Sequence, residues 1–289
     1  ALTTLLGGTD KALCTALRID TIDSLSECAV SRPQHALARV VSKKHAANLV
    51  TLAPSEDDRI RLLSCRGIAA GAWLGALPSQ PATQMDDLSW RTAVARRLGT
   101  LLPCLMPGSD RPCHATRCPT PPDPYGNHIM HCPLSHKFVP HQMLLHALES
   151  CCKRAGVPAE ASRVNRMNVS LKELLGQSQA DLMIKDFRGM GMDAHLDVTI
   201  IHPLLPSYAH IEYEKPGDAL NLVRSALKLR KYAALDTLGN VFIVFGAESF
   251  GALDPDGVRF FNDFIVQGYC LSRMVDPSTF RGSLVAMRF

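Results

Sequence analysis

The sequence has no long apolar run, no low-complexity tract, no internal repeat and little excess charge. Its longest stretch free of charged, polar and proline residues runs only from Gly67 to Leu77. A membrane-spanning helix needs about 20 apolar residues, so we expect no membrane association. The 31 basic and 27 acidic side chains leave a formal net charge of +4, which by itself does not indicate a nucleic-acid partner.

What the composition does contain is enough apolar material for a core. Hydrophobic residues make up 46% of the 289 positions, which excludes a wholly disordered chain. At about 100 to 200 residues per domain, a chain of this length has room for one large domain or two modest ones. The chain starts at Ala1 without a methionine or a basic-then-apolar leader, so we expect a fragment of a longer protein.

The ten cysteines are unevenly placed. Four of them lie within residues 104–132, and six of the eleven histidines occur in or just after this stretch: His114, His128, His131, His136, His141 and His146. A secreted disulfide framework spreads its pairs over a short chain, whereas a Cys/His cluster inside a long chain indicates metal binding. We therefore expect an intracellular, reducing compartment.

The spacing Cys113-x4-Cys118-x9-His128-x3-Cys132 supplies three thiolates and one imidazole. Four such ligands form a closed tetrahedral set that selects zinc and leaves no position for a catalytic water. We predict a structural Zn²⁺ that folds this proline-rich segment. The alternative is a group of unrelated buried thiols and a surface histidine.

Neighbouring side chains offer the same ligand atoms. The options that stay open are Cys104 in place of Cys113, and His131 or His114 in place of His128. His128 is preferred because Gly126 allows a tight turn towards the metal.

Hydrophobic periodicity predicts a mixture of helices and strands. Helices are expected at residues 10–19, 33–50, 57–68, 90–102, 141–155, 218–235 and 258–266, and strands at 179–187, 195–202 and 241–245. We predict an α/β (α+β) fold in three parts, namely a helical lead-in at 1–102, a zinc-knuckle segment at 103–137 and a sheet-containing domain at 138–289.

Two of the predicted strands carry one aspartate each among apolar neighbours. In a hairpin centred near Gly189, facing residues have numbers that sum to 378, which pairs Asp181 with Asp197 on one face. Two opposed carboxylates need a positive partner, and Mg²⁺ prefers such oxygen ligands, so we predict a catalytic Mg²⁺ site at Asp181, Asp197 and Val198. The alternative is two strand-end or edge residues in water. We interpret Lys185, Asp186 and Asp193 as solvent-exposed residues that flank the turn.

The helix expected at 218–235 places Arg224, Lys228 and Tyr232 on one stripe. The residues expected on the opposite, core-facing side are Leu220, Val223, Leu227 and Leu235. A lysine near a scissile phosphate can orient or deprotonate the nucleophile and stabilise developing charge, which predicts metal-assisted phosphodiester hydrolysis. The alternative for Lys228 is a solvated helix face.

Several motifs occur in a fixed order along the chain. They are Trp73-Leu74, Arg97-Leu98-Gly99, Asp123-x2-Gly126-x-His128-x3-Cys132, Gln179-Ala180-Asp181, Leu196-Asp197-Val198-Thr199-Ile200, Lys228-x3-Tyr232 and Glu248-Ser249-Phe250-Gly251. From about residue 62 to about residue 264, this combination resembles the part of non-LTR retrotransposon polyproteins that follows the reverse transcriptase and contains a restriction-like endonuclease.

The resemblance implies a zinc knuckle followed by a PD-(D/E)XK nuclease with a mixed central sheet flanked by helices. It makes Asp181 and Asp197 the metal-binding aspartates, Lys228 a lysine moved from strand to helix, and Tyr232 its accessory. Ala180 stands where the PD motif has proline, and Thr199 where the strand has lysine. The implied activity is nicking of target DNA, leaving a 3′-hydroxyl for target-primed reverse transcription in the nucleus.

Other functions stay open. The partners implied by the resemblance are target DNA, the element RNA and the reverse transcriptase of the same polyprotein. A catalytically silent module would hold nucleic acid through phosphate contacts from its cations. Those cations are Arg91, Arg96, Arg97, Lys137, Arg163, Arg166, Arg224, Lys228, Arg230 and Lys231. A scaffold that docks the polymerase through the N-terminal helices is a third possibility.

Overall fold

The computed structural model describes residues 33–68, 70–75, 84–105, 113, 118–132, 134, 138–161, 180–189, 191–233, 240–266, 268 and 270. The helix expected at 10–19 lies outside these residues. The chain forms two compact units, Ala1–Leu62 and Leu63–Phe289, and each is described by itself. Among the described residues, no helix combines the length and the apolar character that crossing a membrane requires.

The first unit contains helix α3 (Pro33–Thr51), as expected at residues 33–50, and the start of α4 (Glu56–Cys65). Glu56, Asp57 and Asp58 occupy the first turn of α4, where negative charge interacts favourably with the helix dipole. This helix ends at Cys65, three residues before the expected end at Ile68.

The second unit begins with short helical elements. They are the end of α4, the 3₁₀ turn η2 (Ala72–Gly75) and helix α5 (Asp87–Leu98). Asp86 caps α5 by accepting a hydrogen bond from the Ser89 N–H at 2.9 Å. The helix was expected to run to residue 102 but ends at Leu98, because Gly99 adopts a left-handed conformation with φ of 71°.

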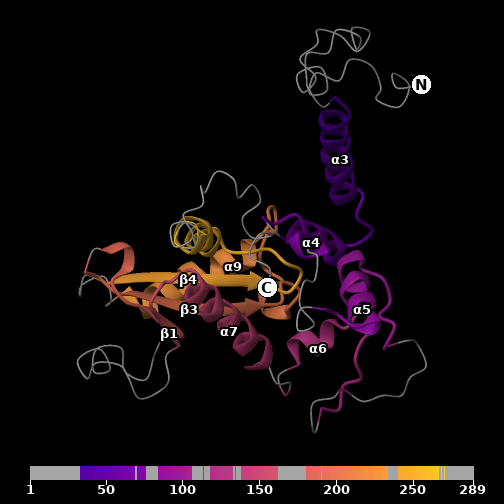
Figure 1. The fold of residues 1–289 in the computed structure, drawn as a ribbon. Helices are drawn as coiled ribbons and strands as arrows, with labels where there is room; N and C mark the ends of the chain where they lie inside the picture. The colour runs from indigo at the N-terminus through magenta and orange to yellow at the C-terminus, as the bar shows by residue number, and fades with distance from the viewer. Residues whose placement is uncertain are drawn as a thin grey trace. The chain divides into compact units, whose positions relative to one another are not determined.

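The remainder of the second unit is a mixed four-stranded sheet with helices (Figure 1). Its strands are β1 (Ala159–Ala161), β2 (Leu182–Ile184), β3 (Ala194–Ile201) and β4 (Val241–Glu248), in the spatial order β1-β2-β3-β4. The pairs β1/β2 and β2/β3 are antiparallel, and β3/β4 is parallel. The expected mixed α/β class is confirmed.

The predicted register of the central hairpin is also confirmed. Leu182 pairs with Leu196, and Ile184 with Ala194, so each pair of numbers sums to 378. Strand β2 is shorter than the expected 179–187, because a 3₁₀ turn, η4 (Phe187–Gly189), follows it. Asp186 and Asp193 close the turn: the Asp186 N–H donates to Asp193 Oδ1 at 3.1 Å. Both residues flank the turn, as expected.

Helix α7 (Phe138–Arg154) packs against β1 and β3 (Figure 1). The core here is formed by alternate residues of β2 and β3, by α7 and by the π-helix η7 (Phe260–Val266), which directly follows helix α12 (Pro255–Arg259). Its most buried members include Leu148, Cys152, Leu182, Ile184, Leu196, Phe261 and Ile265. The helix expected at 258–266 is thus present but begins at Pro255.

The parallel strands β3 and β4 need a crossover, which contains the 3₁₀ turn η5 (Pro206–Tyr208), helix α9 (Asp218–Val223), the π-turn η6 (Arg224–Lys228) and helix α10 (Leu229–Lys231). The Leu229 N–H donates to the Arg224 carbonyl, five residues back. This turn therefore contains one residue more than an α-helical turn.

The extra residue changes which side chains face the core. Leu220 and Val223 are buried, as predicted, but the expectation for Leu227 was wrong, since 62% of it is exposed. Tyr232, beyond the π-turn, is only 1% exposed. Leu235 lies outside the described residues.

Candidate functional site

The Cys/His segment is shaped by a tight turn before helix α6 (Asn127–His131). Asp123 accepts hydrogen bonds from the Tyr125 N–H at 3.0 Å and from the His128 N–H at 2.6 Å. Gly126 has a φ of 74°, which other residues adopt at a cost, so the expectation that a glycine turn directs His128 is confirmed. His128 and Cys132 then lie four residues apart and face the same side.

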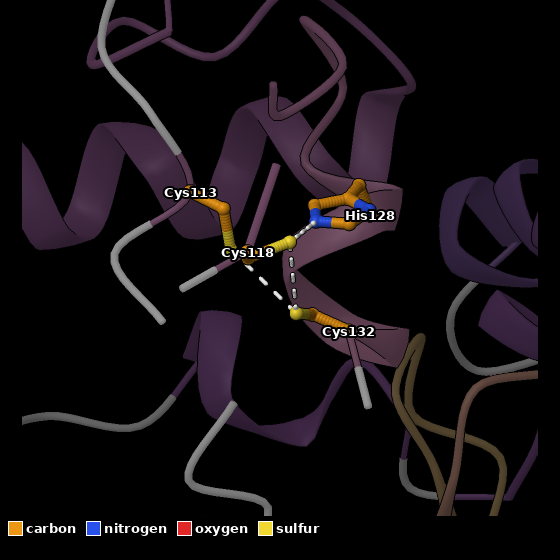
Figure 2. A group of neighbouring side chains, drawn as sticks. All are labelled: Cys113, Cys118, His128 and Cys132. Atoms are coloured by element: carbon orange, nitrogen blue, oxygen red, sulfur yellow. Dashed lines mark hydrogen bonds between the residues drawn. The ribbon is translucent and has the colours of Figure 1, made fainter. Parts of the chain in front are cut away.

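Cys113, Cys118, His128 and Cys132 point towards one another (Figure 2). The Sγ atom of Cys132 lies 3.7 Å from that of Cys113 and 3.6 Å from that of Cys118, whose Sγ lies 3.4 Å from His128 Nε2. Ligands at zinc's bond lengths of about 2.3 Å to sulfur and about 2.0 Å to nitrogen, in tetrahedral geometry, lie roughly 3.8 Å (S to S) and 3.5 Å (S to N) apart. The four side chains therefore form a Cys3His set that can bind a metal such as zinc.

The structure also selects between the ligand alternatives. Cys113 belongs to the set, whereas Cys104 is exposed and does not. His128 occupies the imidazole position. His114 and the side chain of His131 lie outside what the structure describes. Cys113 and Cys132 are buried, and Cys118 and His128 are partly buried.

The two predicted aspartates occur where β2 and β3 begin to pair. The Asp181 N–H donates to the Leu196 carbonyl at 2.9 Å, which extends the ladder by one step. The Oδ2 atom of Asp181 accepts the Val198 N–H at 2.7 Å and lies 3.1 Å from His141 Nε2. The backbone of Val198 therefore orients one of the two carboxylates.

Asp197, on β3, is 4% exposed and is held by three side chains. The Lys228 Nζ lies 2.6 Å from Oδ2, the Tyr232 hydroxyl donates to Oδ1 at 2.9 Å, and the Thr199 hydroxyl donates to Oδ2 at 3.2 Å. The tyrosine ring stacks on Phe242 with centroids 4.2 Å apart. Lys228 and Tyr232 thus contact the second aspartate, and Lys228 does not lie on a solvated face.

The electrostatics of this carboxylate site favour a positive partner. Burial raises the pKa of Asp181, and the Asp197 charge raises it further, while the Val198 N–H and His141 oppose both effects. Burial and the Asp197 carboxylate raise the pKa of the Tyr232 phenol. Tyr232 is therefore a neutral hydrogen-bond donor near neutral pH.

Two residues of this site were not predicted as part of it. His141 was counted with the histidine-rich segment, but it lies near the start of α7 and its Nε2 atom contacts Asp181 Oδ2. Thr199 was noted as the residue in place of a strand lysine, and it binds Asp197 instead. The only sequence signal for Thr199 is its position two residues after Asp197, which puts both on one face. No signal indicates His141.

Several of the cations proposed for phosphate contacts bind groups of the protein itself, as Lys228 does at Asp197 and as Arg91 does at Asp87. The Arg96 guanidinium lies over the Phe250 ring at 5.3 Å and donates to the Gly126 carbonyl at 3.4 Å. Arg97 donates to the carbonyls of Ala70 and Cys65 at 2.8 and 2.9 Å. Arg224 pairs with Asp256. The exposed cations Arg230 and Lys231 retain that interpretation, and Lys137, Arg163 and Arg166 lie outside the described residues.

The motif Glu248-Ser249-Phe250-Gly251 ends β4 and has a structural role. Glu248 is buried and accepts a hydrogen bond from the Tyr213 hydroxyl, and burial raises its pKa. Gly251 has a φ of 111°, and a Cβ there would lie 3.0 Å from the Cβ of Ala70. This loop is therefore a close-packed contact with the segment that follows α4.

Among the described residues, the Cys3His set is the one group of three or more His, Cys, Asp or Glu side chains that could hold a metal ion, and its four ligand atoms all lie within 4.8 Å of one another. His141, Asp181 and Asp197 do not form a second such group. No family model, no curated protein and no solved structure matches this chain.

Proposed function

We propose that the chain is the endonuclease region of a non-LTR retrotransposon polyprotein, which nicks target DNA with Mg²⁺ and leaves a 3′-hydroxyl for reverse transcription. The observation that carries the proposal is the contact of Lys228 and Tyr232 with Asp197, beside Asp181, in the register expected from the sequence. These four residues come from two strands and one helical crossover, and the motif resemblance assigns all of them to one catalytic site.

The fold agrees with this proposal. The element order α7-β1-β2-β3-α9-β4 forms a mixed sheet flanked by helices, which is the type of core that the PD-(D/E)XK resemblance implies. The two aspartates lie at the paired strands β2 and β3, and the lysine lies on the crossover that leads to β4. A Cys3His segment precedes this core in the sequence, as the resemblance implies, and helices precede that segment, as hydrophobic periodicity predicts.

The donor set fits a hard divalent cation. Asp181 and Asp197 offer carboxylate oxygens, and Mg²⁺ typically binds through one or two carboxylates while keeping several waters. Burial and the neighbouring charge of Asp197 raise the pKa of Asp181, and this cost of ionisation supports a cation as the partner of the carboxylate. When bound, Mg²⁺ would act as a Lewis acid that stabilises the charge developing on the scissile phosphate.

The protein's own groups would then prepare the attack. Tyr232 and Thr199 fix the Asp197 carboxylate by hydrogen bonds, and Lys228 lies against it as a cation. In this position the Lys228 ammonium can orient an attacking water and stabilise negative charge on the phosphate oxygens. Lys228 therefore takes the role that a strand lysine would have at the position of Thr199.

The Cys3His set, with zinc bound, would have a structural role, since its four protein ligands leave no open coordination position. Arg96 connects it to the sheet, because the same guanidinium contacts the turn before α6 and the Phe250 ring at the end of β4. Target DNA, element RNA and the polyprotein's reverse transcriptase are the proposed partners, and the nucleus is the proposed location.

Nicking of supercoiled plasmid with Mg²⁺ tests the proposal. We expect Asp181→Ala and Lys228→Ala each to lower the nicking rate by roughly 100-fold or more, since each removes a group that acts in the transition state. The matched control is Asp263→Ala, which removes an exposed aspartate of the C-terminal helix η7. Equal nicking by Asp181→Ala and the control would exclude this site, and DNA binding without any nicking would favour the silent nucleic-acid-binding module.

A further inference from the structure

The contact between His141 and Asp181 joins two distant parts of the sequence. His141 lies near the start of α7, and its Nε2 atom is 3.1 Å from Asp181 Oδ2, with 24% of each side chain exposed. The same oxygen accepts the Val198 N–H at 2.7 Å. Two nitrogens from α7 and β3 therefore converge on one carboxylate oxygen.

The arrangement leaves the other oxygen of Asp181 for a ligand. Within the part of the chain that the structure describes, Oδ1 accepts no hydrogen bond, whereas Oδ2 contacts both nitrogens. A carboxylate whose Oδ2 is fixed by two N–H donors has little freedom to rotate, so Oδ1 keeps one direction.

A ligand role for the imidazole fits the geometry less well. Among the described residues, the Cys3His set is the group of three or more such side chains placed to hold one ion, and His141, Asp181 and Asp197 do not form another. The contact distance of 3.1 Å is that of an N–H donor and a carboxylate oxygen.

We propose that His141 is a positioning residue, which donates its Nε2–H to Asp181 Oδ2 and so directs Asp181 Oδ1 towards the divalent cation. The inference rests on the proposed function, because it concerns the same carboxylate site. Hydrogen-bond partners of metal-binding side chains commonly change metal affinity by about 10- to 100-fold when they are removed. Here the partner comes from α7, which thereby couples the position of this helix to cation binding.

Binding of Mn²⁺ to the full, zinc-loaded chain tests the proposal, with isothermal titration for affinity and electron spin echo for the ligands. We expect His141→Ala to weaken Mn²⁺ binding about 10-fold or more, and His141→Gln, whose amide N–H reaches a similar position, to retain affinity within about threefold. The matched control is His146→Ala, an exposed histidine on the same helix that lies near Glu149. It should bind Mn²⁺ as the wild type does.

Several results would overturn this assignment. Equal Mn²⁺ affinity of His141→Ala and wild type would show that the contact does not position Asp181. Loss of affinity in His141→Gln as large as in His141→Ala would exclude the donor role. Nitrogen coupling to bound Mn²⁺ that disappears in His141→Ala would make His141 a ligand instead. In all three cases, nicking of DNA by the wild-type chain would still support the proposed function. Absence of both Mn²⁺ binding and nicking in the wild type would overturn the His141 assignment and the proposed function together.

Discussion

The ion pair between Lys228 and Asp197 leads to a quantitative prediction for Lys228→Met. The side chains are 22% and 5% exposed and their charged atoms lie 2.6 Å apart, so methionine leaves a buried carboxylate without its cation. Removal of one partner of a buried pair costs about 3 to 5 kcal/mol. Hydrogen bonds from Tyr232 and Thr199 persist in the variant, so we expect the lower end of that range, about 3 kcal/mol.

Thermal unfolding near neutral pH measures this loss. For a unit of about 200 residues, each kcal/mol lowers Tm by roughly 2 to 4 °C, so Lys228→Met should unfold about 6 to 12 °C below the wild type. The matched control is Lys185→Met, which removes an exposed ion pair with Glu160 whose side chains are 53% and 45% exposed. Exposed pairs contribute about 1 kcal/mol or less, so the control should differ by no more than a few degrees.

The double variant Asp197→Asn/Lys228→Met separates the pair from other effects of methionine. With the charge removed from both partners, it should regain most of the stability lost in Lys228→Met. A loss below about 1 kcal/mol in Lys228→Met, or a double variant no more stable than the single one, would contradict the reasoning.

Three further predictions concern the surrounding structure. Cys132→Ser should abolish stoichiometric zinc in elemental analysis and expose the segment around α6 to proteolysis, because three ligands hold the metal poorly. Gly251→Ala should lower Tm more than Gly189→Ala does, since both positions have positive φ but only Gly251 also lies against Ala70. Glu248→Gln should raise Tm at about pH 8 and lose this advantage as the pH falls towards about 4.5. Burial raises the pKa of Glu248 in the folded state above its value in the unfolded state. Ionisation of this carboxyl group therefore destabilises the fold at high pH, and the penalty disappears once the group is protonated in both the folded and the unfolded state.

The hairpin register and the Cys3His set could be predicted because they follow from local rules. Leu182 pairs with Leu196 because side chains in a strand alternate with a period of two and the turn lies midway between the two residues. Cys113 and His128 come together because they are thiolate and imidazole ligands at the short spacings typical of zinc sites. Neither inference needs knowledge of how distant segments pack.

The parts that could not be predicted depend on tertiary contacts or on irregular backbone. The π-turn at residues 224–228 shifts the register of the crossover by one residue, and apolar spacing does not report such a shift, so Leu227 was placed on the wrong side. His141 reaches Asp181 only through the packing of α7. Arg96 looked like a surface cation, but the turn before α6 and the Phe250 ring occupy its guanidinium.

The central claim is that Asp181 and Asp197 form the catalytic site of a DNA-nicking nuclease. The experiment that tests it most directly measures Mg²⁺-dependent nicking of supercoiled plasmid by the wild type and by Asp197→Asn, followed by extension of the nick with a DNA polymerase. We expect the wild type to produce nicks that the polymerase extends from a 3′-hydroxyl, and Asp197→Asn to produce none above background. Equal nicking by the two proteins, or wild-type nicks that no polymerase extends, would contradict it.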